Sequence, residues 1–310
     1  MRRTPDSAAA RHLTRRRLVI GGVATVGLVA GGAVASRAFE DDGADGVVPQ
    51  VRPGRLLTGS FSSAARRGQR CGWALALPPG HSRDLPVAVV LHGRGNDHAS
   101  AFSPGYLGLD RFLAATVAGG TPPFALVSVD GGESYWHARD DGDDAPAMIV
   151  DELLPLVARH GVRTDRVGLL GWSMGGFGAL HLAGALGPDR VAAVAVMSPA
   201  LWRDYADTAP GAYDDADDFA AVDVTSRQES LRGIPVRIDC GRSDPFAAAT
   251  RDYVRGFERR PAGGFQPGRH TVGYWRRMAP RQLAFLGDHF AASARGDRGG
   301  PLAPPDSVSA

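Results

Sequence analysis

Short runs of apolar residues without polar alternation recur through the middle of the chain. The clearest runs are residues 87–91, 124–129, 167–170, 191–197 and, less regularly, 234–238. A continuous apolar run of this length is typical of a parallel strand that is covered on both faces. Another run, residues 72–77, stops at two prolines and is predicted to be an antiparallel edge strand.

Helical patterns lie between these runs, so that strand and helix alternate. Residues 147–159 place five apolar side chains on one stripe, and a shorter pattern includes Tyr253 and Phe257. This alternation predicts an α/β fold with a mostly parallel central sheet, helices on both faces, and reactive groups on loops at the carboxyl ends of the strands. Residues 202–228 are too few for a separate domain, so we expect a small excursion above the site and no large cap domain.

The first 35 residues have the pattern of an export signal. Arg15, Arg16 and Arg17 precede an apolar, glycine-rich run that ends in small residues. This order is typical of a signal peptide, and the arginines resemble the twin-arginine motif. An uncleaved membrane anchor is the alternative, because the apolar run is long enough to span a bilayer. We therefore expect a signal peptide at 1–35, a linker at 36–50, a catalytic domain at 51–292 and a disordered tail at 293–310.

Composition and charge argue against nucleic acid as a ligand. The 310 residues are 44% hydrophobic and 22% charged, which suits one large globular domain with additions at its ends. Residues 1–35 carry six Arg and one Asp, a net charge of +5, so the formal +2 of the whole chain leaves −3 for residues 36–310. Acidic clusters in that remaining part do not suit a nucleic-acid surface. Cys71 and Cys240 lie in strands that need not be neighbours, so their pairing stays open.

A pentapeptide of the form G-x-S-x-G, residues 171–175, lies where an apolar run passes into a helical pattern, with Ser173 at its centre. This sequence is typical of a nucleophile elbow, in which small flanking residues let the chain turn tightly and hold the serine hydroxyl above a strand end. An ordinary Gly-rich turn can contain the same five residues. The residues that follow therefore decide whether Ser173 is a candidate nucleophile.

A serine nucleophile needs a base that takes its proton and an acid that orients the base. The chain has both after Ser173: Asp244 follows the last apolar run, and His270 lies in a Gly-containing loop before the last helical pattern. Asp244 could instead cap a helix, and Asp239 is the alternative acid, although its place in an apolar strand favours a structural role. The other histidines precede the acid or lie in predicted helices. His270 is therefore the candidate base.

The developing oxyanion of acyl transfer needs two hydrogen-bond donors. One is expected from the backbone amide of Met174 at the start of a helix, and the other from the Arg94 amide in the glycine-containing loop 92–97. Tyr135 and Trp136 follow a central strand and either line the substrate pocket or only pack their loop. No residue set resembles a metal site or a phosphate-binding loop, so no cofactor is expected.

Six motifs together resemble the esterase D branch of the α/β-hydrolase superfamily. They are Leu91-His92-Gly93, residues 130–132 with 134–136, residues 171–180, residues 198–202, residues 239–241 with 244–246, and residues 268–275. That branch includes S-formylglutathione hydrolase, feruloyl esterases and the secreted mycolyltransferases of the antigen 85 complex. The resemblance spans roughly residues 86–290. It implies an α/β-hydrolase fold, a triad of Ser173, Asp244 and His270, and an oxyanion hole formed by the amides of Arg94 and Met174.

Two departures from this pattern narrow the expected function. The antigen 85 enzymes usually have Glu as the acid and Asp-Gly where this chain has His92-Gly93, and formylglutathione hydrolases work in the cytoplasm without an export signal. We therefore expect a secreted or envelope-associated serine carboxylesterase or lipase that acts on a small-molecule or lipid ester through an acyl-enzyme. The alternatives are an acyltransferase acting on a sugar or lipid alcohol, and a secreted binding protein without catalysis. The oligomeric state stays open.

Overall fold

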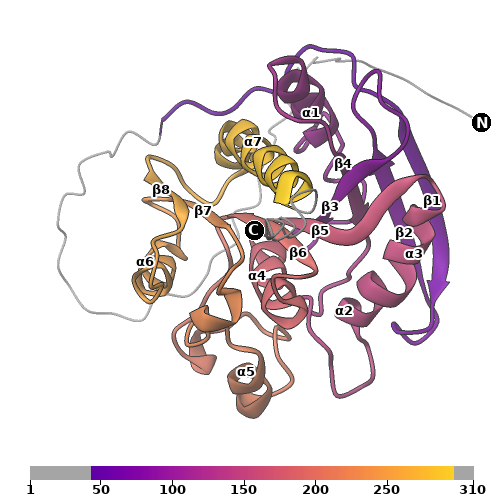
Figure 1. Cartoon of the computed structure of the whole chain (residues 1–310). Coiled ribbons are helices and arrows are strands. Elements are labelled where there is room, and N and C mark those ends of the chain that lie inside the picture. The colour runs from indigo at the N-terminus through magenta and orange to yellow at the C-terminus, as the bar shows by residue number, and fades with distance from the viewer. Residues whose placement is uncertain (1–42, 297–310) are drawn as a thin grey trace, which may run out of the picture. The chain divides into compact units, whose positions relative to one another are not determined.

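Figure 1 shows the computed structural model, which describes residues 43–296 of the chain. The predicted signal peptide at 1–35, the first residues of the predicted linker and residues 297–310 of the predicted tail lie outside this described part. Within residues 43–296, no helix is both long enough and apolar enough to cross a membrane.

The described residues form an eight-stranded sheet in the order β1-β2-β4-β3-β5-β6-β7-β8. The strands are β1 (Leu56–Ser63), β2 (Gln69–Ala76), β3 (Leu85–Leu91), β4 (Ala125–Val129), β5 (Val162–Trp172), β6 (Val191–Met197), β7 (Val236–Gly241) and β8 (Ala262–Gln266). The pairs β1–β2 and β2–β4 are antiparallel, and all the other neighbours are parallel. The predicted α/β fold with a mostly parallel central sheet is confirmed.

Alternate side chains of the central strands belong to two separate hydrophobic cores. In β3, Val87, Val89 and Leu91 lie in one core, whereas Ala88 and Val90 lie in the other. Successive side chains of a strand point to opposite faces of the sheet, so a strand covered on both sides has no face for polar residues. This is why the apolar runs identified the central strands, and why every residue of β6 is buried.

Helices cover both faces of the sheet (Figure 1). They are α1 (Leu109–Ala118), α2 (Ala145–Ala147), α3 (Leu154–Ala158), α4 (Met174–Leu186), α5 (Ala216–Val222), α6 (Ala247–Arg255) and α7 (Val272–Gly296), with short 3₁₀ turns at Tyr205–Asp207 and Gln228–Leu231. One core takes residues from α1 and α7, and the other takes residues from α3 and α4. The predicted helix at 147–159 corresponds to α2 and α3, which a π-helical segment, Met148–Leu153, joins.

Both edges of the sheet differ from the sequence prediction. The predicted edge strand at 72–77 is β2, which lies inside the sheet because β1 pairs with it on its outer side. The β1 residues are mostly exposed and rich in Ser, Thr and Gly, so they give no apolar run. At the other edge, β8 contains two adjacent glycines and no buried residue, so it also lacks an apolar run and is not predicted from the sequence.

Part of the predicted linker is held against the last helix. The Gly46 amide donates a hydrogen bond to the Gly273 carbonyl at 2.8 Å, and the Arg277 guanidinium donates to the Ala44 carbonyl at 2.7 Å. The Val48 side chain is buried in the same core as α1 and α7. At its far end α7 extends to Gly296, so residues 293–296 of the predicted tail are helical.

The two cysteines do not form a disulfide in this fold. Cys71 lies in β2 and Cys240 lies in β7, and four strands separate them in the sheet. Both are buried free thiols, and burial raises the pKa of each. They therefore act as small apolar core residues.

Candidate active site

Ser173 lies in a sharp turn between the end of β5 and the start of α4. Its backbone has φ 56° and ψ −123°, a positive-φ conformation that is uncommon for a residue with a side chain. The surrounding backbone holds this turn: the Ser173 amide donates to the Met197 carbonyl at 3.0 Å, and the Ser173 carbonyl accepts from the Ala200 amide at 2.9 Å. Backbone strain that a fold maintains in this way is often found at functional sites.

The two glycines of the pentapeptide are required by close backbone packing. A Cβ atom at Gly171 would lie 2.0 Å from the Gly175 carbonyl oxygen, and one at Gly175 would lie 1.9 Å from the Leu91 carbonyl oxygen. Neither neighbouring atom belongs to a flexible side chain, so no rotamer change could relieve such a clash. The G-x-S-x-G spacing therefore brings α4 directly against the ends of β3 and β5.

Three side chains from distant parts of the chain meet at this turn. The Nε2 atom of His270 lies 2.9 Å from the Ser173 hydroxyl, and its Nδ1 atom lies 2.9 Å from Oδ2 of Asp244. Asp244 is buried, whereas His270 is partly exposed. Asp244 follows β7 and His270 lies between β8 and α7. Because these strands are parallel to β5, their carboxyl ends bring both side chains to the same edge of the sheet as Ser173.

The second oxygen of the Asp244 carboxylate has a separate role in the loop. Its Oδ1 atom accepts a hydrogen bond from the Phe246 amide at 2.9 Å, just before α6 begins at Ala247. Asp244 is therefore not the N-cap of α6, which is Phe246 without a side-chain cap, and its Oδ1 atom instead holds the turn ahead of the helix. This arrangement fixes the orientation of the carboxylate toward the imidazole.

Asp239, the alternative acid, makes no contact with His270 in the structure. Its carboxylate is fully buried and accepts hydrogen bonds from Arg237, Gln266 and Gln282, all of them at 2.7 to 2.9 Å. Gln266 in turn accepts a hydrogen bond from the Tyr274 hydroxyl at 2.7 Å. Asp239 therefore lies in a structural network beneath the loop that carries His270.

The loop 92–97 lies beside the turn that holds Ser173. Its first residue, His92, is buried, and burial lowers the pKa of this imidazole, which is therefore neutral near pH 7. The His92 Nε2 atom accepts a hydrogen bond from the Gly131 amide at 3.0 Å, which places the proton on Nδ1, 2.9 Å from the Gly93 carbonyl. Arg94 follows in this loop, and Met174 is the first residue of α4, where amides have no intrahelical acceptor.

Tyr135 and Trp136 are both buried, and both have a positive φ angle. The Trp136 indole packs against Gly131 and Gly178 and donates from Nε1 to the His92 carbonyl at 3.1 Å. Trp136 therefore supports the loop 92–97 through its hydrogen bond to the His92 carbonyl. The Tyr135 ring instead contacts Trp202, with the ring centroids 5.3 Å apart.

An aromatic wall, formed by Trp202 and Phe246, extends from His270. The Phe246 ring meets the His270 ring at a centroid distance of 5.2 Å, and Trp202 meets Phe246 at 5.4 Å. Both side chains are only partly buried. Neither residue is a candidate from the sequence, although Trp202 lies in the motif 198–202 and Phe246 in the motif 244–246. The motifs could have indicated both residues, but the sequence does not show how their loops bring the two rings together.

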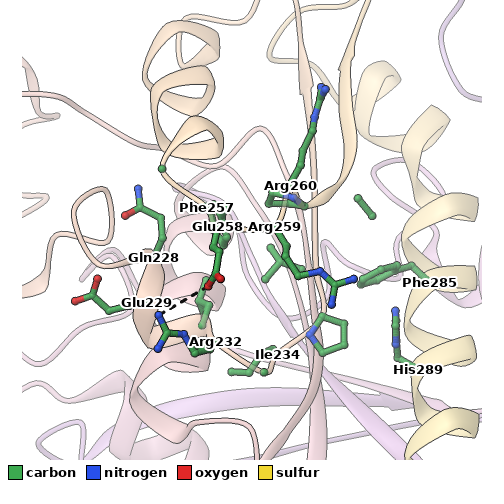
Figure 2. Close-up of a pocket in the computed structure, with 17 residues that line it drawn as sticks. Gln228, Glu229, Arg232, Ile234, Phe257, Glu258, Arg259, Arg260, Phe285 and His289 are labelled. Atoms are coloured by element: carbon green, nitrogen blue, oxygen red, sulfur yellow. Dashed lines mark ion pairs between the residues drawn. The ribbon is translucent and has the colours of Figure 1, made fainter.

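A separate cavity of about 560 Å³ lies at the amino-terminal ends of β7 and β8, and Figure 2 shows the residues that line it. The residues that line it include Val236 and Ala262, which begin β7 and β8, whereas the Ser173 group lies beyond the carboxyl ends of the parallel strands. An ion pair between Arg232 and Glu258, with a 3.9 Å separation, lies at this cavity. None of the site residues proposed from the sequence lines it. In residues 43–296, no group of three or more His, Cys, Asp or Glu side chains is placed to hold a metal ion.

Comparisons with known proteins identify related sequences and folds. A family model described as "Putative esterase" matches residues 64–277, more than half of the chain. A ferulic acid esterase structure has 21% identity and a TM-score of 0.65, and covers 76% of this chain and 99% of its own. An S-formylglutathione hydrolase from Agrobacterium tumefaciens has 18% identity and a TM-score of 0.63, with 78% and 97% covered. A fluorophosphonate-binding serine hydrolase from Staphylococcus aureus has 17% identity and a TM-score of 0.61, with 76% and 99% covered. No curated protein matches the chain.

Proposed function

Because the chain belongs to the esterase family that this model describes, and is therefore an ester-hydrolysing enzyme, we propose that Ser173, His270 and Asp244 are its catalytic triad. Two contacts of 2.9 Å support the proposal: Asp244 contacts the Nδ1 atom of His270, and the Nε2 atom of His270 contacts the Ser173 hydroxyl. The proposed substrate of the enzyme is a carboxylic ester, and the proposed intermediate is an acyl group bound to Ser173.

Acylation begins when the Nε2 atom of His270 takes the proton of the Ser173 hydroxyl as the oxygen attacks the carbonyl carbon of the ester. The carbonyl oxygen becomes an oxyanion and accepts hydrogen bonds from the amides of Arg94 and Met174. When the tetrahedral species collapses, the carbon–oxygen bond to the alcohol breaks, and His270 gives its proton to the leaving alkoxide. Asp244 stays ionised and holds the Nδ1 proton, so that Nε2 faces the serine.

Deacylation repeats these steps with water. His270 takes a proton from the water molecule that attacks the acyl carbon, and the same two amides hold the second oxyanion. The bond to Ser173 then breaks, the carboxylic acid leaves, and the proton returns to the serine oxygen. No step needs a metal or an organic cofactor.

The aromatic wall of Trp202 and Phe246 is proposed to line the acyl side of the site. It is partly exposed and begins at the His270 ring, so a bound ester would lie against it. Two structures of similar fold are a ferulic acid esterase, named for an aromatic acid, and an S-formylglutathione hydrolase, named for a thioester with a very small acyl group. A panel of 4-nitrophenyl esters from acetate to palmitate, together with aryl-acid esters, would rank these substrate classes.

Labelling with a fluorophosphonate probe tests the proposed nucleophile directly. We expect one equivalent of probe to bind, and tryptic mass spectrometry to find the added mass on the peptide that contains Ser173. Only a hydroxyl activated by a neighbouring base reacts quickly with such a probe. No labelling, or labelling of another serine, would contradict the assignment, and no labelling would favour a binding protein on the same fold.

We propose that residues 1–35 direct export by the twin-arginine route. Replacing both Arg15 and Arg16 with Lys is expected to leave the protein in the cytoplasm of a host that has this pathway, because the arginine pair is the recognised feature. Cell fractionation followed by intact-mass measurement checks this, and the exported wild-type protein should begin near Ser36. Full-length protein in the membrane fraction would favour an uncleaved anchor instead.

A further inference from the structure

The side chain of Asn96 connects the loop 92–97 to the residue directly before the nucleophile. Its Oδ1 atom accepts a hydrogen bond from Nε1 of Trp172 at 3.2 Å and another from the Tyr106 hydroxyl at 2.9 Å. Trp172 is the last residue of β5 and is completely buried, so its indole has a fixed position. One amide oxygen therefore joins three segments that are distant in the sequence.

The backbone of Asn96 closes a tight turn around Arg94. The Asn96 amide donates to the Gly93 carbonyl at 3.1 Å, and Gly95, the third residue of this turn, has φ +72°. That angle suits glycine at this place in a turn. At the other end of the turn, a Cβ atom on Gly93 would lie 2.7 Å from Nε1 of Trp172. Both ends of the turn thus rest on the same indole, with the Arg94 amide between them.

The cluster around Trp172 also reaches the proposed catalytic base. The Trp172 ring contacts Tyr106 and Trp275 at centroid distances of 6.1 Å and 6.4 Å, and the Trp275 ring meets His270 edge-on at 5.0 Å. Loss of the Asn96 acceptor would leave two donors, on Trp172 and Tyr106, without their acceptor. Trp172 is completely buried, whereas Tyr106 and Asn96 are partly exposed, so the indole N–H carries the larger desolvation cost, and a movement of the loop relieves it.

We propose that Asn96 is a positioning residue that sets the place of the Arg94 amide relative to the Met174 amide. The inference rests on the proposed function, in which these two amides hold the oxyanion. An oxyanion donor acts only within about 2.7 to 3.1 Å of the oxygen, so a shift of the turn by a fraction of an ångström weakens it. Trp172 suits this task because it is covalently adjacent to Ser173 and two residues from Met174.

Asn96→Leu tests the inference, because leucine has a similar size and cannot accept a hydrogen bond. We expect kcat/KM for a 4-nitrophenyl ester to fall about 10- to 100-fold, mostly through kcat. The inhibition constant of a trifluoromethyl ketone, which forms an oxyanion on Ser173, should rise by the same factor. The pH midpoint of kcat/KM should stay unchanged, because the His270 contacts are intact. A structural role alone would lower the melting temperature without this parallel change in inhibition.

A double-mutant cycle separates the Trp172 contact from general packing. Trp172→Phe removes the indole donor, whereas Tyr106→Phe removes only the other donor to Asn96 Oδ1 and keeps the Trp172 bond, so we expect Tyr106→Phe to lower kcat/KM less than Trp172→Phe does. We expect Trp172→Phe to lower kcat/KM about tenfold in the wild-type background, and to have little further effect in Asn96→Leu. Additive effects, or an unchanged inhibition constant in Asn96→Leu, would overturn the inference even if ester hydrolysis still depends on Ser173. Failure of the proposed function would show differently, as an inactive wild-type protein or an active Ser173→Ala variant.

Discussion

Ser173→Ala is expected to lower kcat for ester hydrolysis by about four to six orders of magnitude and to leave the fold intact. The hydroxyl is the atom that would form the acyl-enzyme, and it lies 2.9 Å from the Nε2 atom of His270. Alanine can occupy the same turn, because Ser173 makes its supporting hydrogen bonds through the backbone. The residual rate should reflect the oxyanion donors and substrate binding alone. Steady-state kinetics with a 4-nitrophenyl ester, together with a melting curve, measures both effects.

Ser198→Ala is the matched control for this variant. Ser198 also follows a central strand and has a positive φ of 48°, but its buried hydroxyl has no hydrogen-bond partner among the described residues. We expect its kcat to stay within about threefold of wild type. Hydrolysis at the wild-type rate by Ser173→Ala would exclude Ser173 as the nucleophile, whereas an equal loss in both variants would indicate a general disturbance of this edge of the sheet.

The central strands could be predicted from the sequence, because a strand that is buried on both faces requires a continuous run of apolar residues. Strands such as β3 and β6 must be apolar at every position, and this pattern does not depend on any distant residue. The edge strands β1 and β8 bury little, so their residues are free to be Ser, Thr or Gly. These two segments form strands because they pair with β2 and β7, and a local sequence pattern contains no information about that pairing.

The candidate site also has residues that the sequence predicts and residues that only the folded structure shows. Ser173, Asp244 and His270 could be proposed from chain order alone, because parallel strands bring their carboxyl ends to one edge. The contacts of Asn96 and Trp202 could not, because they depend on how loops of several residues turn in space. Trp136 is an example: it has a positive φ, its ring packs against the nearby Gly131 and the distant Gly178, and its Nε1 atom donates to the His92 carbonyl. No local pattern predicts the contacts with Gly178 and His92.

Asp244→Asn should lower kcat by about three to four orders of magnitude, whereas Asp239→Asn should mainly lower stability. An asparagine at 244 can present an NH₂ group to Nδ1 of His270, which favours the tautomer with its proton on Nε2 and so removes the base that Ser173 needs. At 239, the buried carboxylate is the ionic partner of Arg237 and also accepts from two glutamines. Loss of its charge leaves the Arg237 guanidinium without this partner, at a cost of about 3 kcal/mol.

The two aspartates therefore form a pair in which activity and stability should change separately. For a chain of this size, 3 kcal/mol corresponds to a decrease in melting temperature of roughly 6 to 12 °C, and we expect Asp239→Asn to keep kcat/KM within about tenfold of wild type below that temperature. Asp244→Asn should melt close to wild type, because only its contacts with the Phe246 amide and His270 are altered. Measurements of kcat and of the melting temperature for both variants test whether the loss of activity follows Asp244 and the loss of stability follows Asp239. If Asp239→Asn were the inactive variant and Asp244→Asn the active one, the acid would be Asp239, and His270 would have to turn away from Asp244 during catalysis.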